Sequence, residues 1–207
     1  MNNGLIITPY LNTEIRKIAD IDNYDYIICA DTAYIKCKKE NITPNLIIGD
    51  FDHGIIDCDL GLYNNVIKVP SEKNDTDTML CVKKMIELNI KNITIIGGIG
   101  GRCDHTYANI QTIAYCLKNG FKCTIKDDKN EMFMLGCGNH LIETDKKYIS
   151  FFSYSESSVI SIRNAKYSVE NHELTYYFPL GVSNEKTDKP IIAEISKGII
   201  LTICSND

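Results

Sequence analysis

Short apolar runs alternate with helical patterns along the first two thirds of the chain. Runs of Ile, Leu, Val and Cys bounded by turn residues predict buried strands at residues 5–8, 26–30, 46–48, 66–69, 93–96 and 121–125. Apolar residues spaced three or four apart predict helices at residues 13–20, 33–40, 75–86 and 107–117. This alternation is typical of a largely parallel sheet with helices on its faces.

The pattern changes after about residue 130. Segments become short and rich in Ile, Tyr, Phe, Ser and Val, with turn residues between them, which predicts strands at residues 147–152, 159–162, 176–178, 191–195 and 199–203. We therefore expect an α/β protein in two domains. Residues 1–129 would form a Rossmann-like, mostly parallel sheet with flanking helices, and residues 130–207 a small all-β sandwich or barrel.

Acidic residues follow several of the predicted strands. Asp31 ends the second strand, and Asp50 and Asp52 end the third, after Gly49. Because the carboxyl ends of parallel strands meet at one edge of a sheet, these carboxylates would converge where α/β proteins bind ligands. Oxygen ligands of this kind suit Mg²⁺ on a phosphate. A plain helix start remains open for Asp75 and Asp77, since the helix dipole stabilises acids in a first turn by roughly 0.3–1 kcal/mol.

A glycine-rich turn at residues 97–101 follows the fifth strand and precedes a helix. Glycines let backbone amides approach a phosphate, and the helix start adds positive potential. The run is neither a P-loop nor a dinucleotide fingerprint, so a plain tight turn is the alternative. Arg102 favours the phosphate interpretation because its guanidinium suits such a group. Asp104 could instead cap the helix, and His105 is expected to donate a hydrogen bond rather than to bind metal.

Composition narrows the classes of function. The formal net charge is −5, which gives no electrostatic basis for a nucleic-acid or anionic-membrane partner. The nine cysteines show no C-x-x-C spacing, so we expect reduced thiols rather than disulfides, a zinc site or a redox pair. No leader pattern or membrane-length apolar run is present in this sequence, and we expect a cytoplasmic protein.

Five segments in order resemble the thiamine pyrophosphokinase family: residues 30–31, 44–52, 70–77, 100–109 and 181–185. The resemblance implies an ATP-dependent enzyme that transfers a pyrophosphoryl group to the hydroxyl of thiamine, giving thiamine diphosphate and AMP. It implies that residues 1–129 bind ATP and Mg²⁺ and that residues 130–207 bind thiamine. It also implies a homodimer with active sites at the subunit interface, between the catalytic domain of one subunit and the β domain of the other.

The resemblance assigns the metal to three carboxylates, Asp50, Asp52 and Asp77, with Asp75 as the reserve in place of Asp77. Asp31 would complete this acidic edge.

The resemblance also assigns the substrate contacts. The residues expected at the nucleotide and at the reacting centre are Lys73, Thr76, Arg102, Asp104, His105 and Asn109. Lys73 and Arg102 would neutralise phosphate charge, and Asp104 would orient or deprotonate the thiamine hydroxyl, with His105 nearby. Ser183 and Asn184 would contact the thiamine pyrimidine.

The sequence departs from the family pattern in a few places. Thr32-Ala33 replaces two glycines, His53 replaces a serine, and Asn74 replaces a carboxylate. The chain has no tryptophan to cover thiamine, so the choice among Tyr176, Tyr177 and Phe178 stays open. Two alternatives follow, a pyrophosphokinase acting on another hydroxymethyl heterocycle such as a pterin, and a non-catalytic thiamine or nucleotide sensor.

Overall fold

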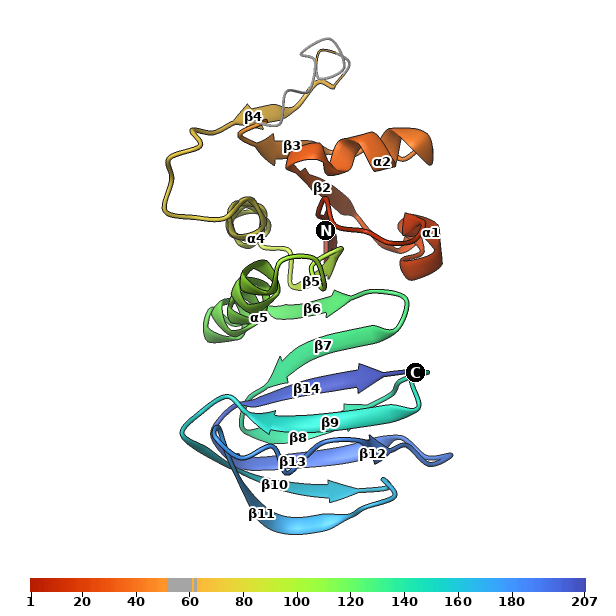
Figure 1. The fold of residues 1–207 in the computed structure, drawn as a ribbon, viewed down its shortest axis with the longest axis vertical. Coiled ribbons are helices and arrows are strands. Elements are labelled where there is room, and N and C mark those ends of the chain that lie inside the picture. Colours follow the sequence, from red (N-terminus) through yellow and green to blue (C-terminus); the bar gives the residue numbers. More distant parts are fainter. Residues whose placement is uncertain (52–60, 62) are drawn as a thin grey trace. The chain divides into compact units, whose positions relative to one another are not determined.

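The computed structural model describes residues 1–51, 61 and 63–207. The chain divides into two compact units, Met1–Asp128 and Lys129–Asp207 (Figure 1). The first unit combines strands with helices, and the second is built from antiparallel strands. The expected mixed α/β fold followed by a second, antiparallel part is therefore confirmed. No helix in the described ranges is long and apolar enough to cross a membrane.

The first unit is organised around six strands. They are β1 (Asn3–Ile7), β2 (Tyr26–Ala30), β3 (Leu46–Gly49), β4 (Val66–Lys68), β5 (Asn92–Ile96) and β6 (Lys122–Lys126). Their order is β6-β5-β1-β2-β3-β4, and each neighbouring pair is parallel. The chain runs outward from β1 to β4 and then returns to the other side of β1. The direction of winding reverses between β1 and β5, which is where open α/β sheets bind ligands beyond their carboxyl ends.

Helices cover both faces of this sheet. They are α1 (Ile15–Ile18), α2 (Tyr34–Lys39), α4 (Asp77–Glu87) and α5 (Cys103–Lys118). Leu5 and Ile7 of β1 pack in one cluster with α1 and α2. Gly4, which lies on the opposite face of the same strand, faces Met85 of α4. Helix α4 also packs against α5. Because both faces are covered, the central strands are apolar at almost every position.

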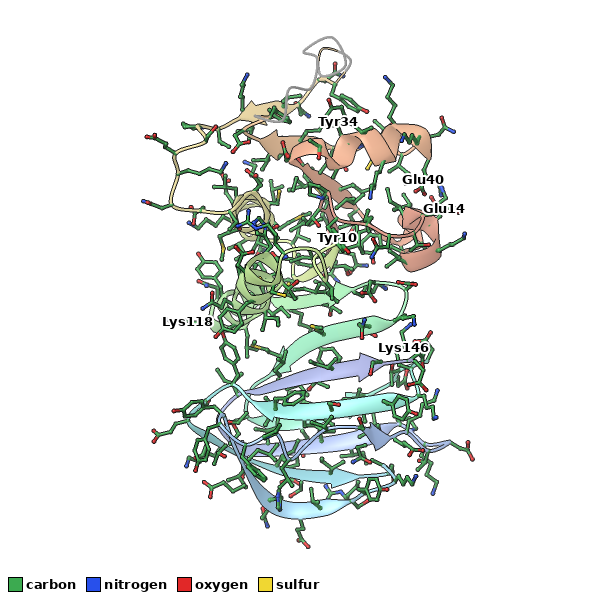
Figure 2. The ribbon with its side chains drawn as sticks, in the orientation of Figure 1. Tyr10, Glu14, Tyr34, Glu40, Lys118 and Lys146 are labelled. Carbon is green, nitrogen blue, oxygen red and sulfur yellow. The ribbon has the colours of Figure 1, made fainter. Side chains whose placement is uncertain are left out.

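Helix α1 is shorter than the predicted helix at residues 13–20, because a distant side chain decides where it begins. The carboxylate of Glu40 accepts hydrogen bonds from the backbone amides of Ile15 (2.8 Å) and Arg16 (3.3 Å). Figure 2 shows Glu40 beside Glu14 at this end of α1. Ala19 already has an extended backbone, with φ −138°, so the helix ends after Ile18. The missing helix cap is thus supplied from the residue that follows α2.

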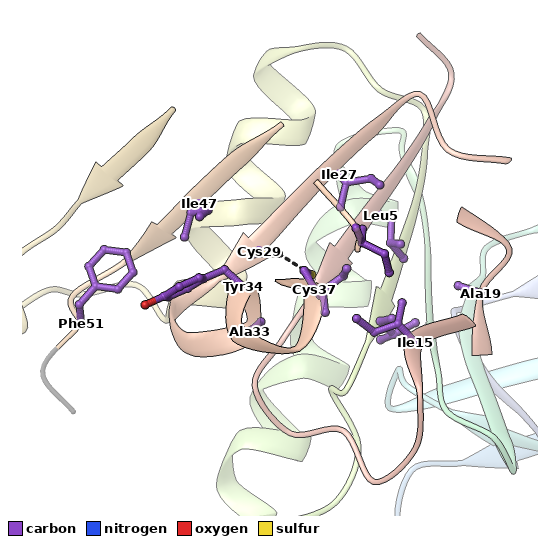
Figure 3. Close-up of a cluster of buried hydrophobic side chains, with 13 residues drawn as sticks. Leu5, Ile15, Ala19, Ile27, Cys29, Ala33, Tyr34, Cys37, Ile47 and Phe51 are labelled. Carbon is purple, nitrogen blue, oxygen red and sulfur yellow. Dashed lines mark hydrogen bonds between the residues drawn. The ribbon is translucent and has the colours of Figure 1, made fainter. Parts of the chain in front are cut away.

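A buried cluster between α2 and the sheet anchors the strand ends that carry the acids. Tyr34 is fully buried, and Figure 3 shows its ring between α2 and the strands, on the side toward Ile47 and Phe51. The Cys29 and Cys37 sulfurs lie 3.2 Å apart in the same cluster, as free thiols. Since Tyr34 follows the turn after β2 and Phe51 follows β3, packing here holds both strand ends in place.

The second unit contains two four-stranded antiparallel sheets. Its strands are β7 (Asn130–Leu135), β8 (Gly138–Ile142), β9 (Tyr148–Ser153), β10 (Ser157–Arg163), β11 (Val169–Thr175), β12 (Asn184–Glu185), β13 (Ile191–Lys197) and β14 (Ile200–Ser205). One sheet has the order β12-β9-β14-β7, and the other β11-β10-β13-β8. Phe151 and Ile200 from the first sheet share one buried cluster with Ile160 and Ile195 from the second. The apolar faces of both sheets therefore build one core.

The strand predicted at residues 176–178 is wrong. Tyr176, Tyr177 and Phe178 are 60–72% exposed and lie in the turn after β11. Local bonds fold the chain back there, as in the bond from the Phe178 amide to the Thr175 carbonyl at 3.4 Å. Aromatic residues favour strands only where a neighbouring strand and a packed face are available, and this segment pairs with no other strand in the described structure.

Gly181 marks a close backbone approach within the second unit. A Cβ atom at this position would lie 2.0 Å from the carbonyl oxygen of Phe151, whose amide donates a hydrogen bond to the Gly181 carbonyl at 2.9 Å. Only glycine fits this distance without moving β9. The loop before β12 is thus held directly against a core strand.

We expect Gly181→Ala to lower the free energy of unfolding by about 1–3 kcal/mol, because the added methyl group must push the backbone of β9 away. Urea denaturation of the whole chain measures this change. Gly136→Ala is the matched control, since a Cβ there meets nothing within 4 Å. Equal stability of the two variants would contradict the close approach.

Candidate active site

Two acids of the first unit follow neighbouring parallel strands, each at or beside a residue in an unusual backbone conformation. Asp31 follows β2 with φ 45°, and Asp50 follows β3 and precedes Phe51, which has φ 55°. Of the seven described non-glycine residues with positive φ, four are asparagines, which tolerate this region, and the others are Asp31, Phe51 and Ser183. Such strain persists only where the surroundings impose it and gathers at functional sites.

Gly49 brings the two strand ends together. A Cβ on Gly49 would lie 2.7 Å from the Cα of Asp31, so the end of β3 closely approaches the backbone of the residue that follows β2. Gly49 is the last residue of β3 and has no positive φ, so it does not serve as a turn glycine. Its role is close approach, and the approach places the Asp31 and Asp50 carboxylates on the same edge.

Lys73 bridges Asp50 and Asp77. Its ammonium lies 3.0 Å from Asp50 Oδ2 and 3.0 Å from Asp77 Oδ1. The side chains of Lys73 and Asp50 are each 15% exposed, and that of Asp77 is 25% exposed. Burial opposes the charge on Lys73, but the hydrogen bond to Asp50 and the charges of both carboxylates outweigh it and raise the pKa of the ammonium. Residues from β3, a loop and α4 therefore meet at one ionic cluster.

Asp31 adds a third carboxylate to this cluster. Burial raises the pKa of Asp31, and the negative charges of Asp77 and Asp50 raise it further. Its Oδ1 atom is buried and has no hydrogen-bond partner among the described residues. Asp77 Oδ1 is buried too, and its contact with Lys73 lies outside hydrogen-bond geometry. Two buried carboxylate oxygens thus have unused acceptor capacity.

The donor set fits a hard cation bound together with a phosphate, because Mg²⁺ takes one or two carboxylates and leaves its other positions to water and phosphate oxygens. Within the described part of the chain, no three Asp, Glu, His or Cys side chains converge closely enough to form a metal cage. Asp52, expected to be a metal ligand, and its neighbour His53 lie outside the described residues.

The two acids near the start of α4 have different surroundings. Asp77 is the first residue of the helix and faces Lys73, whereas Asp75 precedes the Thr76 cap and pairs with Lys83 at 2.7 Å. The structure therefore brings Asp77, and not Asp75, to the cluster with Asp50. The cap at Thr76 sets this difference because it decides where the helix begins.

The glycine turn after β5 is held by three side chains. A Cβ on Gly100 would lie 2.5 Å from the ring of Tyr10, which follows β1. Thr106 Oγ1 accepts a hydrogen bond from the Gly100 amide at 3.1 Å, and the buried Asn109 amide donates to the Gly98 carbonyl at 2.9 Å. Sequence reasoning missed Tyr10 and Thr106. The place of Tyr10 shortly after the first apolar strand is a signal that could have indicated it.

Arg102 and Asp104 form an exposed pair at the start of α5. Arg102 donates from Nε to Asp104 Oδ1 at 3.1 Å and from a terminal nitrogen to Oδ2 at 2.5 Å. The hydrogen bonds from Arg102 lower the pKa of the Asp104 carboxyl, with a smaller contribution from the His105 amide. Asp104 is not the N-cap, because that position belongs to Arg102. Both charged groups face solvent beside the glycine turn and are available to a ligand.

In the second unit, the residues at 181–185 form a tight loop. Asn184 is buried, and its amide accepts from the Tyr167 amide (3.0 Å) and donates to the Tyr167 carbonyl (2.7 Å). Ser183 is exposed, has φ 58°, and its amide donates to Ser150 Oγ at 3.0 Å. Asn184 therefore holds the loop, while Ser183 is presented to solvent in a strained conformation.

A largely apolar cavity of about 280 Å³ lies beside this loop. Phe151, Tyr167, His172, Leu180 and Asn184 are among the residues that line it. Its volume and lining suit part of a small heterocyclic ligand. The exposed aromatic residues 176–178 belong to the same connection between β11 and β12.

The fold and the chemistry of its strand ends define a class of protein that handles phosphates at the carboxyl edge of a parallel sheet. The family model for the thiamin pyrophosphokinase catalytic domain matches residues 19–125, and that for the thiamin pyrophosphokinase vitamin B1 binding domain matches residues 139–200. A thiamine pyrophosphokinase of Bacillus subtilis is 34% identical over 193 residues, which cover 90% of each chain. The chain belongs to the thiamine pyrophosphokinase family.

Solved structures show the same fold. The crystal structure of thiamine pyrophosphokinase from Bacillus subtilis matches with a TM-score of 0.86 and 27% identity over 100% of both chains. A thiamin pyrophosphokinase family protein from Enterococcus faecalis matches with a TM-score of 0.86 over 100% of both chains, at 24% identity. The mixed α/β unit and the antiparallel unit are thus a shared architecture.

Thr76 gives a test of how this site is positioned. Its Oγ1 accepts a hydrogen bond from the Met79 amide at 3.1 Å. We expect Thr76→Ala to cost about 1 kcal/mol of unfolding free energy, since the first amides of α4 lose their cap. Thermal or urea unfolding measures this, and Thr76→Ser, which keeps the hydroxyl, should retain most of the stability. A Ser variant as unstable as the Ala variant would show that the hydroxyl is not the cause.

Proposed function

We propose that this chain is a thiamine pyrophosphokinase, which transfers the pyrophosphoryl group of ATP to the hydroxyl of thiamine and releases AMP. The observation that carries the proposal is the pair of family matches, catalytic and vitamin B1 binding, in order over the two units. The 34% identical relative, matched over 90% of both chains, has the same name. The vitamin B1 match favours thiamine over a pterin, and the intact acidic cluster argues against a sensor that only binds.

The first unit is the ATP-binding half in this proposal. Its strand order and the reversal between β1 and β5 support a Rossmann-like description. The second unit is a small sandwich, since its two sheets share one core, and it would bind thiamine. We keep the expected domains, residues 1–129 and 130–207, with these roles.

Mg²⁺ would be held by Asp50 and Asp77, with Asp52 and Asp31 contributing to the same edge. The buried Oδ1 atom of Asp31, which has no hydrogen-bond partner among the described residues, supports this assignment. Bound there, Mg²⁺ would neutralise charge on the ATP phosphates and stabilise the charge that develops during transfer.

Positive groups of this chain would hold the phosphates. Lys73, the amides of the glycine turn at residues 97–101 and Arg102 lie on the edge where the phosphates would bind. Thr76 would act mainly by placing Asp77, and Asn109 by holding Gly98. Positioning and charge neutralisation together are the main contributions expected in phosphoryl-type transfer.

Asp104 would accept a hydrogen bond from the thiamine hydroxyl and orient it for attack on the β-phosphorus. The hydrogen bonds from Arg102 lower the pKa of Asp104, which leaves an ionised carboxylate to accept this hydrogen bond but makes it a weaker base. The proton of the hydroxyl would pass toward this carboxylate as the new O–P bond forms and the bond between the β-phosphorus and the oxygen bridging to the α-phosphorus breaks, which releases AMP. His105, the next residue in α5, would help to shape the site.

Thiamine would bind at the second unit. The exposed Ser183 hydroxyl is suited to contact the pyrimidine, whereas Asn184 would chiefly hold the loop in place. Tyr176, Tyr177 and Phe178 are candidates to cover the ring in the absence of tryptophan. Their exposure also supports the expected homodimer with active sites at the subunit interface, because such aromatic residues are enriched in interfaces.

A reducing compartment such as the cytoplasm suits the cysteine chemistry. The eight cysteines in the described part are free thiols, and six of them are buried. Burial raises the pKa of Cys204 to about 11, so this thiol stays protonated and unreactive.

The direct test is to incubate the purified protein with ATP, Mg²⁺ and thiamine and to measure AMP and thiamine diphosphate together. We expect equal amounts of both products and no product after chelation with EDTA. AMP formed with a pterin alcohol but not with thiamine would overturn the substrate assignment. Binding of both ligands without either product would indicate a sensor.

The two acids near the start of α4 give a second test. We expect Asp77→Asn to lower kcat/KM about 100-fold or more, equivalent to about 2.7 kcal/mol of transition-state stabilisation. Asp75→Asn is the matched control, because Asp75 pairs with Lys83 outside the cluster, and its effect should stay below about threefold. A larger loss of kcat/KM in Asp75→Asn than in Asp77→Asn would assign the metal to Asp75.

A further inference from the structure

Lys73 occupies the space between two of the carboxylates proposed to hold the metal. Its ammonium is 3.0 Å from Asp50 Oδ2 and 3.0 Å from Asp77 Oδ1, and only 15% of its side chain is exposed. A cation that binds both oxygens directly must lie close to the same position, because Mg²⁺ sits about 2.1 Å from each of its ligands. The ammonium and the metal therefore compete for the same two oxygens.

The charge balance shows why this position is filled by a cation. Asp31, Asp50 and Asp77 place three carboxylates in one partly buried cluster at the ends of β2 and β3 and the start of α4. One ammonium offsets only part of this charge. If Lys73 leaves without a replacement, the carboxylates face each other with less compensation, which is unfavourable at low effective dielectric. If a metal arrives while Lys73 stays, two cations crowd the same oxygens.

We propose that Lys73 is an exchangeable counter-ion, which holds Asp50 and Asp77 together before substrate binds and moves onto the nucleotide phosphates when the metal takes its place. The inference rests on the proposed ATP and metal site and adds an order of events to it. When metal binds without nucleotide, it must displace the Lys73 ammonium from Asp50 and Asp77, and the ammonium then has no new anionic partner. Nucleotide supplies that partner, so metal and nucleotide each strengthen the binding of the other.

The neighbouring ion pair of Lys83 and Asp75 provides a matched control. It has a similar distance, 2.7 Å, and also involves an acid at the start of α4. Its lysine is 44% exposed and, within the described residues, forms no ion pair with Asp50 or Asp77. Removing the charge of Lys83 changes the net charge of the protein equally but should leave the metal position unaffected.

The experiment is to measure Mn²⁺ binding to the whole protein by electron paramagnetic resonance, with and without α,β-methylene-ATP. In this analogue the link between the α- and β-phosphorus atoms, which breaks during pyrophosphoryl transfer, cannot be cleaved. In the unsubstituted protein we expect the nucleotide analogue to tighten Mn²⁺ binding about tenfold or more. Without the analogue, Lys73→Met should bind Mn²⁺ about tenfold more tightly than the unsubstituted protein, a change of 1.4 kcal/mol. The analogue should bind Lys73→Met more weakly, and its enhancement of Mn²⁺ binding should shrink by a similar factor. Lys83→Met should behave like the unsubstituted protein.

Unchanged or weaker Mn²⁺ binding by folded Lys73→Met would overturn the proposal, because Lys73 would then support the site instead of competing for it. Lys73→Gln removes the charge but keeps a polar end, and it should give the same tightening if Lys73→Met fails to fold. The product assay separates this result from the function. If Mn²⁺ binding changes as expected but no thiamine diphosphate forms, the proposed function is overturned and the counter-ion role of Lys73 stands. If thiamine diphosphate forms but Lys73 does not compete with Mn²⁺, the counter-ion role is overturned and the proposed function stands.

Discussion

Repulsion among carboxylates at the end of a parallel sheet is the constraint on which this structure depends. Parallel strands must place their carboxyl ends at one edge, and this chain puts Asp31 and Asp50 there and adds Asp77 from the start of α4. The sheet tolerates them because Lys73 bridges two of the three and because Tyr34 and Phe51 fix the neighbouring backbone in the core. The contacts that stabilise this edge are thus the same ones that the proposed function assigns to substrate and metal.

The two units contribute different physical means of recognition. In the first unit, charged side chains and a glycine turn prevail, and these are the groups that the proposed recognition of phosphates and metal would use. In the second, Asn184 and Gly181 hold a loop against β9, and this loop presents Ser183 beside an apolar cavity. A heterocycle can be bound by such a surface through shape, stacking and few hydrogen bonds.

Several residues of the candidate site act by positioning a neighbouring backbone segment. Thr76 determines where α4 begins, Asn109 holds the Gly98 carbonyl, and Tyr10 packs on the glycine turn. Each acts on the position of a backbone segment and not through a reactive group of its own. Family motifs therefore contain many residues whose replacement would reduce function through geometry, by displacements that matter in transfer reactions.

The sequence by itself determined the alternation of strands and helices, the antiparallel second part and the family, because apolar periodicity and ordered motifs are local properties of the chain. Only the tertiary structure decided which residues of those motifs meet. It paired Lys73 with Asp50 and Asp77, left Asp75 with Lys83, and exposed residues 176–178, which look like a strand. It also brought Glu40 to the start of α1 and Tyr10 to Gly100. These outcomes depend on contacts between distant segments, and such contacts leave no periodic trace in the sequence.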